Sequence, residues 1–211
     1  EYKFEAMTSE LQKALTAYTK QGGSLMVTGS YLLTDMWTSP VATDADRRFA
    51  TDVLHASFGG AMATRRGEVK GVSQTLFKSG FGVEFNTELN DKIYCVESPE
   101  VVRAAGKGAY TAMRYRASNQ PSAIIVSGKY RTFVAGFPFE TVIDAEERDA
   151  MMKGVHLASG EWILFRNSGD LFYNDLVIER VFSAYEDKGE AFIAGDIRYL
   201  KGDSYKDVRP N

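Results

Sequence analysis

The chain has 211 residues, 44% of them apolar, which is enough for one large domain or two small ones. Its 25 basic and 28 acidic side chains give a formal charge of -3 without a basic run, so neither nucleic acid nor an anionic membrane is favoured as a partner. The single cysteine, Cys95, excludes an internal disulfide and a multi-thiolate metal site, and no apolar run is long enough to cross a bilayer.

The first predicted element is an amphipathic helix over residues 9–22. Ser9 and Gln12 have the spacing of a capping box, and apolar side chains then recur with the helical period. The pair Gly22 and Gly23 should end this helix with at least one residue at positive φ, a conformation that glycine adopts without steric cost. A chain that begins on a helix is unusual for a doubly wound sheet, which raises the question of an upstream strand.

The helix leads into a short apolar strand, residues 24–28. Its apolar residues do not alternate with polar ones, which indicates a central strand covered on both faces of an α/β sheet. The following loop, TGSYLLTD, carries hydroxyls and one carboxylate. Because ligands of open α/β sheets gather where such strands end, Ser30 and Asp35 are candidates for a site.

A second helix is predicted over residues 44–58, carrying His55 and ending at the glycines 59 and 60. Residues 61–136 then change character, because short β-rich runs are separated by Gly, Asn, Pro and Ser. The runs are FGVEF, IYCVE, YTAMRY, AIIVS and RTFVAGF. Residues 127–130 read as a hairpin turn, which makes AIIVS and RTFVAGF an antiparallel pair.

The last part of the chain is predicted to be a helix followed by a β-α-β tail. Asp144 and Glu147 form a capping pair for a helix over residues 145–158. WILF, a helix over roughly residues 174–188 and the run AFIAG follow. The predicted domains are therefore an α/β domain, residues 1–158, with its β-rich segment at 61–136, and an α/β tail, residues 159–211, packed on the same domain.

Two segments resemble class I glutamine amidotransferase-like domains. One is LQKALTAYTKQGGSLMVTGSY, and the other is RTFVAGFPFET, which is similar to a strand ending in a Phe-His-Pro-Glu type sequence. The similarity is closer still to such domains within large bacterial proteins labelled xanthan-lyase-like, and it covers about residues 5–158. It implies a flavodoxin-like α/β fold, in which helices flank a mostly parallel sheet and the β-rich segment is an antiparallel insertion.

The chemistry of that family depends on a cysteine at a sharp strand-to-helix turn, activated by a histidine and a carboxylate. This chain has Ser30 and Tyr31 where the thiol is expected. Phe137 stands where the histidine of the second motif would fall, with Pro138 and Glu140 nearby. Since an apolar ring cannot accept a proton, the resemblance implies a domain whose catalytic residues have been replaced.

Three residues remain as catalytic candidates, each set against a structural role in turns and caps that is favoured for all three. Ser30 becomes a nucleophile only if a histidine from elsewhere, such as His156, reaches it. Asp35 and Asp196 both follow predicted central strands and together would resemble the carboxylate pairs that act on glycosides. We expect the TGSYLLTD loop to lie beside the GFPFET strand end, with Ser30 bonded to the backbone or to Asp35. The predicted ligand-binding residues are Ser30, Tyr31, Asp35, Phe137 and Glu140.

The other reactive side chains are interpreted as structural. Cys95 lies in a predicted strand with no helix N-terminus or histidine close to it in sequence. His55 and His156 lack the spacing of a metal site, and no glycine-rich segment has the pattern of a phosphate-binding loop. Neither a metal nor a cofactor is therefore expected. Aromatic side chains of the β-rich segment, such as Tyr110 and Tyr130, are expected in the core rather than on a sugar-stacking platform.

The sequence thus favours a non-catalytic, amidotransferase-like module of a larger bacterial protein that is exported and associated with glycans. Its expected partners are carbohydrate or the other domains of that protein, and its export is implied by the resemblance alone. The alternative is a polysaccharide-acting hydrolase or lyase that uses Ser30 or Asp35. A deep pocket with two converging titratable groups favours the enzyme, and a filled or flat surface favours the module.

Overall fold

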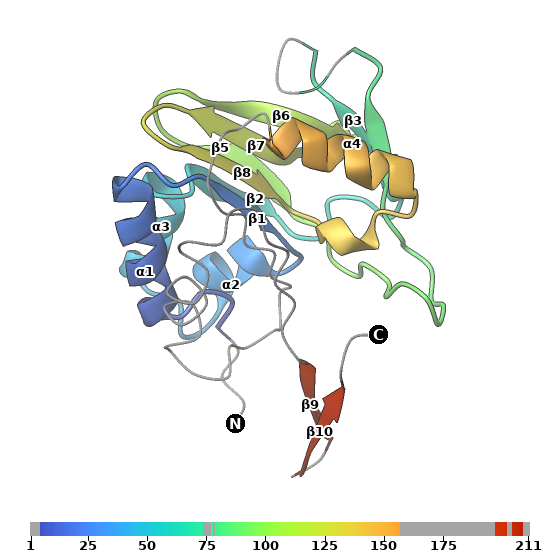
Figure 1. The fold of residues 1–211 in the computed structure, drawn as a ribbon, viewed down its shortest axis with the longest axis horizontal. Helices are drawn as coiled ribbons and strands as arrows, with labels where there is room; N and C mark the ends of the chain where they lie inside the picture. Colours follow the sequence, from blue (N-terminus) through green and yellow to red (C-terminus); the bar gives the residue numbers. More distant parts are fainter. Residues whose placement is uncertain (1–4, 74–76, 78, 157–196, 202–203, 209–211) are drawn as a thin grey trace, which may run out of the picture. The chain divides into compact units, whose positions relative to one another are not determined.

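The computed structural model describes residues 5–73, 77, 79–156, 197–201 and 204–208 (Figure 1). The chain divides into two units, residues 1–171 and residues 172–211. In the second unit, the described residues form an antiparallel hairpin of β9 (Ile197–Lys201) and β10 (Ser204–Val208). The tail elements predicted at WILF, 174–188 and AFIAG fall on residues 157–196, outside the described residues.

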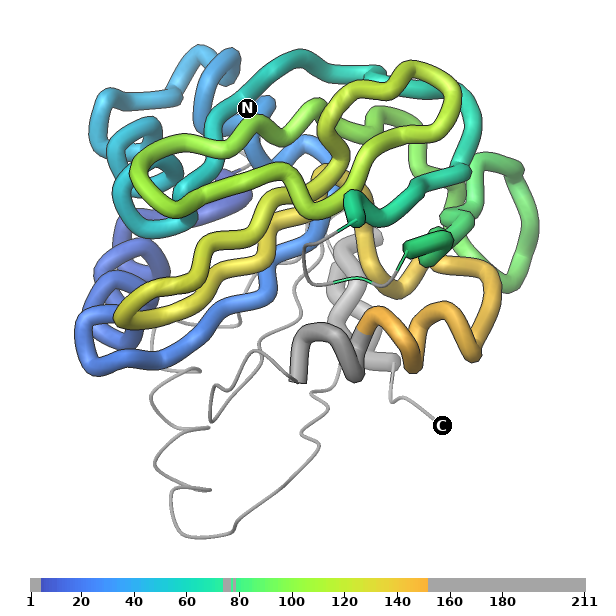
Figure 2. The backbone as a smooth tube through the Cα atoms, turned by 90° about the horizontal axis from the view of Figure 1, so that it is seen from above, coloured from blue at the N-terminus to red at the C-terminus, as the bar shows by residue number. Residues whose placement is uncertain are grey.

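Six strands of the first unit form one sheet, which curls strongly into a half-barrel (Figure 2). Its order is β1 (Leu25–Thr28), β8 (Arg131–Ala135), β7 (Pro121–Ser127), β6 (Ala109–Tyr115), β3 (Glu68–Gly71) and β4 (Gly82–Glu84). Only β1 and β8 are parallel, and the other neighbours in the sheet are antiparallel. A separate antiparallel pair consists of β2 (Ala56–Gly60) and β5 (Val101–Ala104).

This sheet contradicts the predicted flavodoxin-like fold with its mostly parallel sheet. Parallel neighbours need a crossover of about a dozen residues or more, whereas residues 116–120 and 128–130 join β6, β7 and β8 through short connections. The predicted hairpin is confirmed, since Ser127 pairs with Arg131. The segment that we expected as an insertion therefore forms most of the main sheet. β1 is buried along its length as predicted, but it lies at one end of the sheet and not at its centre.

The first helix, α1 (Ser9–Lys20), starts from a different cap than predicted. Thr8 is the N-cap, and its hydroxyl accepts a hydrogen bond from Leu11 N–H at 3.4 Å. Gln12 does not close a capping box with Ser9, because its side-chain amide donates to the Met7 carbonyl at 2.8 Å. The amphipathic pattern nevertheless located the helix correctly.

The predicted glycine stop of α1 is confirmed. Gly22 has a φ of 100°. Its N–H donates to the Thr19 carbonyl at 2.9 Å, and Gly23 N–H donates to the Tyr18 carbonyl at 3.1 Å. This pair of bonds is the Schellman arrangement, which satisfies the last carbonyls of a helix and turns the chain sharply into β1.

Two short helices follow β1 and contact each other and β2 (Figure 1). α2 (Leu32–Thr38) occupies the stretch predicted as a loop, and α3 (Asp44–Asp52) ends before the predicted limit of residue 58. The chain leaves α3 through His55, which has a φ of 56°, and enters β2. Residues 56–60 are therefore strand, and the two glycines at 59 and 60 do not end a helix.

α4 (Ala145–His156) follows a short 3-10 turn, η1 (Phe139–Thr141). Its predicted cap is confirmed, because Asp144 Oδ1 accepts a hydrogen bond from Glu147 N–H at 3.0 Å. The run IYCVE is not a strand, and Cys95 lies in an irregular segment with its thiol 3.2 Å from the Thr87 carbonyl oxygen. The core of the sheet is aromatic and aliphatic, and its largest fully buried side chains include Phe85, Met113, Tyr115, Phe137 and Met151.

Candidate functional site

The two segments that carried the family resemblance lie side by side at one end of the sheet. The parallel pairing of β1 with β8 continues beyond β1, where Gly29 N–H donates to the Ala135 carbonyl at 3.2 Å. Phe139 N–H donates to Thr28 Oγ1 at 3.2 Å. The expectation that the TGSYLLTD loop lies beside the GFPFET strand end is therefore confirmed.

The chain turns sharply from β1 into α2 at Tyr31. This residue is the N-cap of α2 and has φ 61° and ψ 7°, a left-handed conformation that costs a non-glycine residue free energy. A strained strand-to-helix corner is the shape on which hydrolases hold a nucleophile. Here the corner carries a phenol that is 41% exposed. The turn therefore has the shape of a nucleophile site without a thiol or an aliphatic hydroxyl at its corner.

Ser30, one position before the corner, is buried, and its hydroxyl forms no hydrogen bond with any described residue. The prediction that it bonds the backbone or Asp35 is wrong for the described part of the chain. His55 is engaged elsewhere, since its Nε2 lies 2.9 Å from the Tyr130 hydroxyl. Burial lowers the pKa of His55. The side chain of His156 and all of Asp196 lie outside the described part, so the pairings proposed for them stay predictions.

The side chain of Glu100 caps the N-terminus of α2, a role that the sequence did not predict. Its side chain is 0% exposed. One carboxylate oxygen accepts a hydrogen bond from Leu33 N–H at 3.0 Å, and the other accepts one from Thr34 N–H at 2.5 Å. The first N–H groups of a helix have no partner within the helix, and Tyr31 supplies no side-chain cap. A residue more than sixty positions away therefore caps α2, and no pattern in the sequence near α2 predicts this cap.

The backbone of Glu100 is held as firmly as its carboxylate. Its N–H donates to the Gly136 carbonyl at 2.7 Å, and its own carbonyl accepts a hydrogen bond from the Tyr115 hydroxyl at 2.7 Å. A Cβ on Gly136 would lie 2.3 Å from the Glu100 carbonyl oxygen, so only glycine permits this approach. Burial raises the pKa of the Glu100 carboxyl, although hydrogen bonds from Thr34 and Leu33 oppose the rise.

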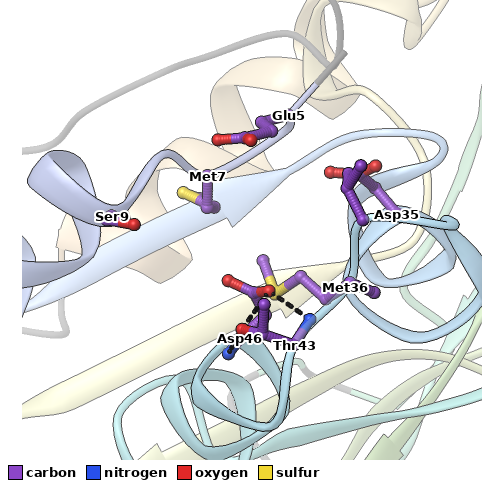
Figure 3. A pocket seen from close by; sticks show the side chains of 9 residues that line it. Glu5, Met7, Ser9, Asp35, Met36, Thr43 and Asp46 are labelled. Carbon is purple, nitrogen blue, oxygen red and sulfur yellow. Dashed lines mark hydrogen bonds between the residues drawn. The ribbon is translucent and has the colours of Figure 1, made fainter. Parts of the chain in front are cut away.

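A cavity of about 70 Å³ lies beside α2, and Figure 3 shows the residues around it. Its walls come from the segment before α1, from α2 and from the connection into α3. Three carboxylates and two thioethers face it, with hydroxyl and small apolar side chains between them. The lining residues are Glu5, Met7, Ser9, Asp35, Met36, Val41, Ala42, Thr43 and Asp46. A cavity of this size holds a few waters or one small group.

The two aspartates of this cavity are in different electrostatic states. Asp35 Oδ2 accepts a hydrogen bond from Ala6 N–H at 2.7 Å, but burial outweighs this bond and raises the pKa of Asp35. Burial also acts against the charge of Asp46, yet hydrogen bonds from Thr43 and Gln12 outweigh it and lower the pKa of Asp46. Gln12 Nε2 donates to Asp46 Oδ1 at 2.6 Å. Asp46 is thus held ionised, whereas Asp35 is shifted toward its neutral form.

The remaining predicted ligand residues do not share this cavity. Phe137 is 0% exposed and stacks on Phe85, with ring centroids 5.0 Å apart. Glu140 Oε1 accepts a hydrogen bond from the Tyr94 hydroxyl at 2.5 Å. The structure therefore gathers Ser30 and Tyr31 at the corner, Asp35 in the cavity, and Phe137 in the core.

Comparison with known proteins adds no family. A scan against protein-family models finds no match, and a search of curated proteins finds no similar sequence. The amidotransferase-like resemblance accordingly stays a prediction. Within the described ranges, no group of three or more His, Cys, Asp and Glu side chains is placed to hold a metal ion. No helix in the described part of the chain is long and apolar enough to cross a bilayer.

Proposed function

We propose that this chain is a non-catalytic module of a larger, exported, glycan-associated protein. The observation that carries the non-catalytic part is the capping of α2 by Glu100, and the resemblance alone supports export and the association with glycans. At a working strand-to-helix corner, the N–H of the residue directly after the nucleophile helps to stabilise the oxyanion that forms during acyl transfer. In this chain Leu32 follows the corner residue Tyr31, and the backbone N–H groups of Leu32, Leu33 and Thr34 all stabilise the charge of the buried Glu100 carboxyl. An oxyanion would have to compete for these donors with a carboxyl group that already accepts their hydrogen bonds.

The hydroxyl groups at the corner support the same proposal. A serine hydroxyl at its ordinary pKa is a poor nucleophile. It becomes an effective one when a base lies within about 3 Å and accepts its proton. Ser30 Oγ has no hydrogen-bond partner among the described residues. Phe137, at the position where the resemblance places a histidine, is packed in the core. The position at which the resemblance places the base thus holds a core side chain, which is the arrangement expected of a non-catalytic module.

The test is an activity and binding assay on the purified chain. We expect no ammonia release from glutamine, no cleavage of xanthan, and retardation of the protein in a gel that contains xanthan. The matched variants are Ser30→Ala with the exposed Ser118→Ala as its control, and Asp35→Asn with the exposed Asp91→Asn as its control. Turnover that disappears in Ser30→Ala or Asp35→Asn, but not in the controls, would overturn the proposal. Unretarded migration would remove its glycan part.

One observation favours the alternative, a hydrolase or lyase that acts on a polysaccharide. Asp35 and Asp46 share a cavity while their pKa values are pushed in opposite directions. Glycoside cleavage uses a carboxyl pair in which one member has a raised pKa and the other stays ionised. Asp46, however, already accepts hydrogen bonds from Gln12 and Thr43, which leaves less of it free to act as a base or nucleophile. This alternative would be selected if the chain cleaves xanthan and Asp35→Asn abolishes the cleavage while Asp91→Asn does not.

A further inference from the structure

Glu100 is a buried acid whose bonds reach across the fold. Its carboxylate binds the first turn of α2, its N–H binds the end of β8, and its carbonyl accepts the hydroxyl of Tyr115 on β6. No described lysine, arginine or histidine forms an ion pair with it. Burying a carboxylate without a cation loses roughly several kcal/mol of hydration free energy. The two hydrogen bonds from backbone N–H groups are the main interactions that offset this loss.

The two protonation states of this carboxyl hold α2 differently. When it is ionised, both oxygens accept charge-assisted hydrogen bonds, which are about twice as strong as neutral ones. When it is protonated, the cost of burying the charge disappears, but one oxygen carries a hydrogen and both N–H bonds weaken. α2 is therefore held most tightly in the state that burial opposes.

We propose that Glu100 is a proton-dependent latch on α2, which tightens the helix start when it is ionised and loosens it when it is protonated. The latch also acts on the cavity, because α2 carries Asp35, whose carboxylate accepts a hydrogen bond from the N–H of Ala6, and the neighbours of Ala6, Glu5 and Met7, line the cavity. Loosening α2 changes the position of one wall of the cavity relative to the other. Protonation at Glu100 thus regulates a cavity that the carboxyl itself does not line.

Of the titratable groups near the start of α2, only Glu100 is expected to change its charge together with the hydrogen bonds to Leu33 and Thr34. Tyr115 on β6 faces it, and burial together with the charge of Glu100 raises the pKa of Tyr115 well above its ordinary value, so this phenol stays neutral. The carboxyl that α2 itself carries, Asp35, accepts a hydrogen bond from Ala6 N–H. Burial raises the pKa of Glu100 from its ordinary value of 4.5, so this carboxyl titrates closer to neutral pH than an exposed glutamate does.

The experiment follows the amide protons of Leu33 and Thr34 by NMR while the pH of the full chain is changed. Amide protons bonded to a carboxylate move upfield when the carboxylate is protonated. We expect both signals to move together in a one-proton transition centred above pH 4.5, the ordinary pKa of a glutamate. The transition should be absent in Glu100→Gln and preserved in the control Glu97→Gln, which changes an exposed neighbour.

A second reporter keeps the test decisive if Glu100→Gln does not fold. Trp37 lies on α2, and the other tryptophan is Trp162, so Trp162→Phe leaves fluorescence that comes from α2 alone. Emission from Trp37 should follow the same transition as the two amides. The proposal is overturned if the Leu33 and Thr34 signals do not titrate in the unmodified chain. It is also overturned if they titrate equally in Glu100→Gln, or if Trp37 emission stays constant through their transition.

Discussion

Replacing Gly136 with alanine tests the contact on which the position of Glu100 depends. The added Cβ would lie 2.3 Å from the Glu100 carbonyl oxygen and 2.9 Å from Val102 Cγ2. Gly136 does not have a positive φ, so the substitution acts through steric overlap and not through backbone strain. Overpacking of a tight core costs about 1–3 kcal/mol. The backbone must shift, which weakens the 2.7 Å bonds that the N–H and carbonyl of Glu100 form, each worth about 1 kcal/mol.

Together these effects predict that Gly136→Ala lowers the free energy of unfolding by about 3–5 kcal/mol. Urea denaturation followed by far-ultraviolet circular dichroism measures this loss. The matched control is Gly128→Ala, because Gly128 is exposed and the nearest atom to its added Cβ is 3.9 Å away. We expect the control to change stability by less than about 0.5 kcal/mol. If the two variants differ by less than about 1 kcal/mol, the tight approach between β8 and Glu100 is wrong.

Three further predictions concern other parts of the fold. Gly22→Ala should lower the free energy of unfolding by about 1 kcal/mol, because it forces a Cβ into a φ of 100°, and an unchanged thermal melt would refute the Schellman stop. Phe137→Ala should cost about 3–5 kcal/mol in the same urea assay, whereas Leu89→Ala, at a side chain 91% exposed, should cost almost nothing. Burial raises the pKa of Glu100 above 4.5, because the cost of burying its charge exceeds the gain from the stronger N–H bonds to α2. The folded chain therefore binds this proton more tightly than the unfolded chain does, and the free energy of unfolding declines as the pH rises from 4.5 through the raised value, even though ionisation strengthens the bonds at the start of α2. Glu100→Gln should flatten that decline, and an equally steep slope in the variant would contradict the assignment.

The elements that could be predicted from sequence are those that local chemistry specifies. The Gly22 stop depends on one residue at positive φ, the start of α4 on a capping pair, and the β7–β8 turn on four adjacent residues. The pairing of the two resemblance segments was also expected, and Gly29 and Thr28 make the bonds that join them. That pairing joins residues more than a hundred positions apart, and the expectation came from the resemblance. The other three signals act within a few residues, so they can be recognised without knowledge of the fold.

The errors arose where distant residues decide the local structure. The sequence predicts a loop at α2, because this helix is short and its N-cap, Tyr31, provides no side-chain bond. Glu100, a distant residue, stabilises the helix start instead. α3 was extended too far because nothing marks His55 as a corner before β2. The resemblance implied a mostly parallel sheet, and the apolar run at residues 24–28 could not correct it, because such a run does not reveal the direction of its neighbour. Long-range hydrogen bonds and strand order are properties of the assembled chain.

The position of β1 in the sheet also bears on the order in which the chain folds. β6, β7 and β8 are joined by short turns, so their pairing closes small loops and can form early. β1 pairs with β8 only after about 100 intervening residues have been brought back, a closure that costs roughly 3 kcal/mol more chain entropy than the β7–β8 turn. The β6–β8 meander is thus the natural nucleus, and α1 with β1 docks on it late. Until that docking the outer side of β8 is an unpaired strand edge, and this intermediate is the state in which the chain is most prone to aggregate.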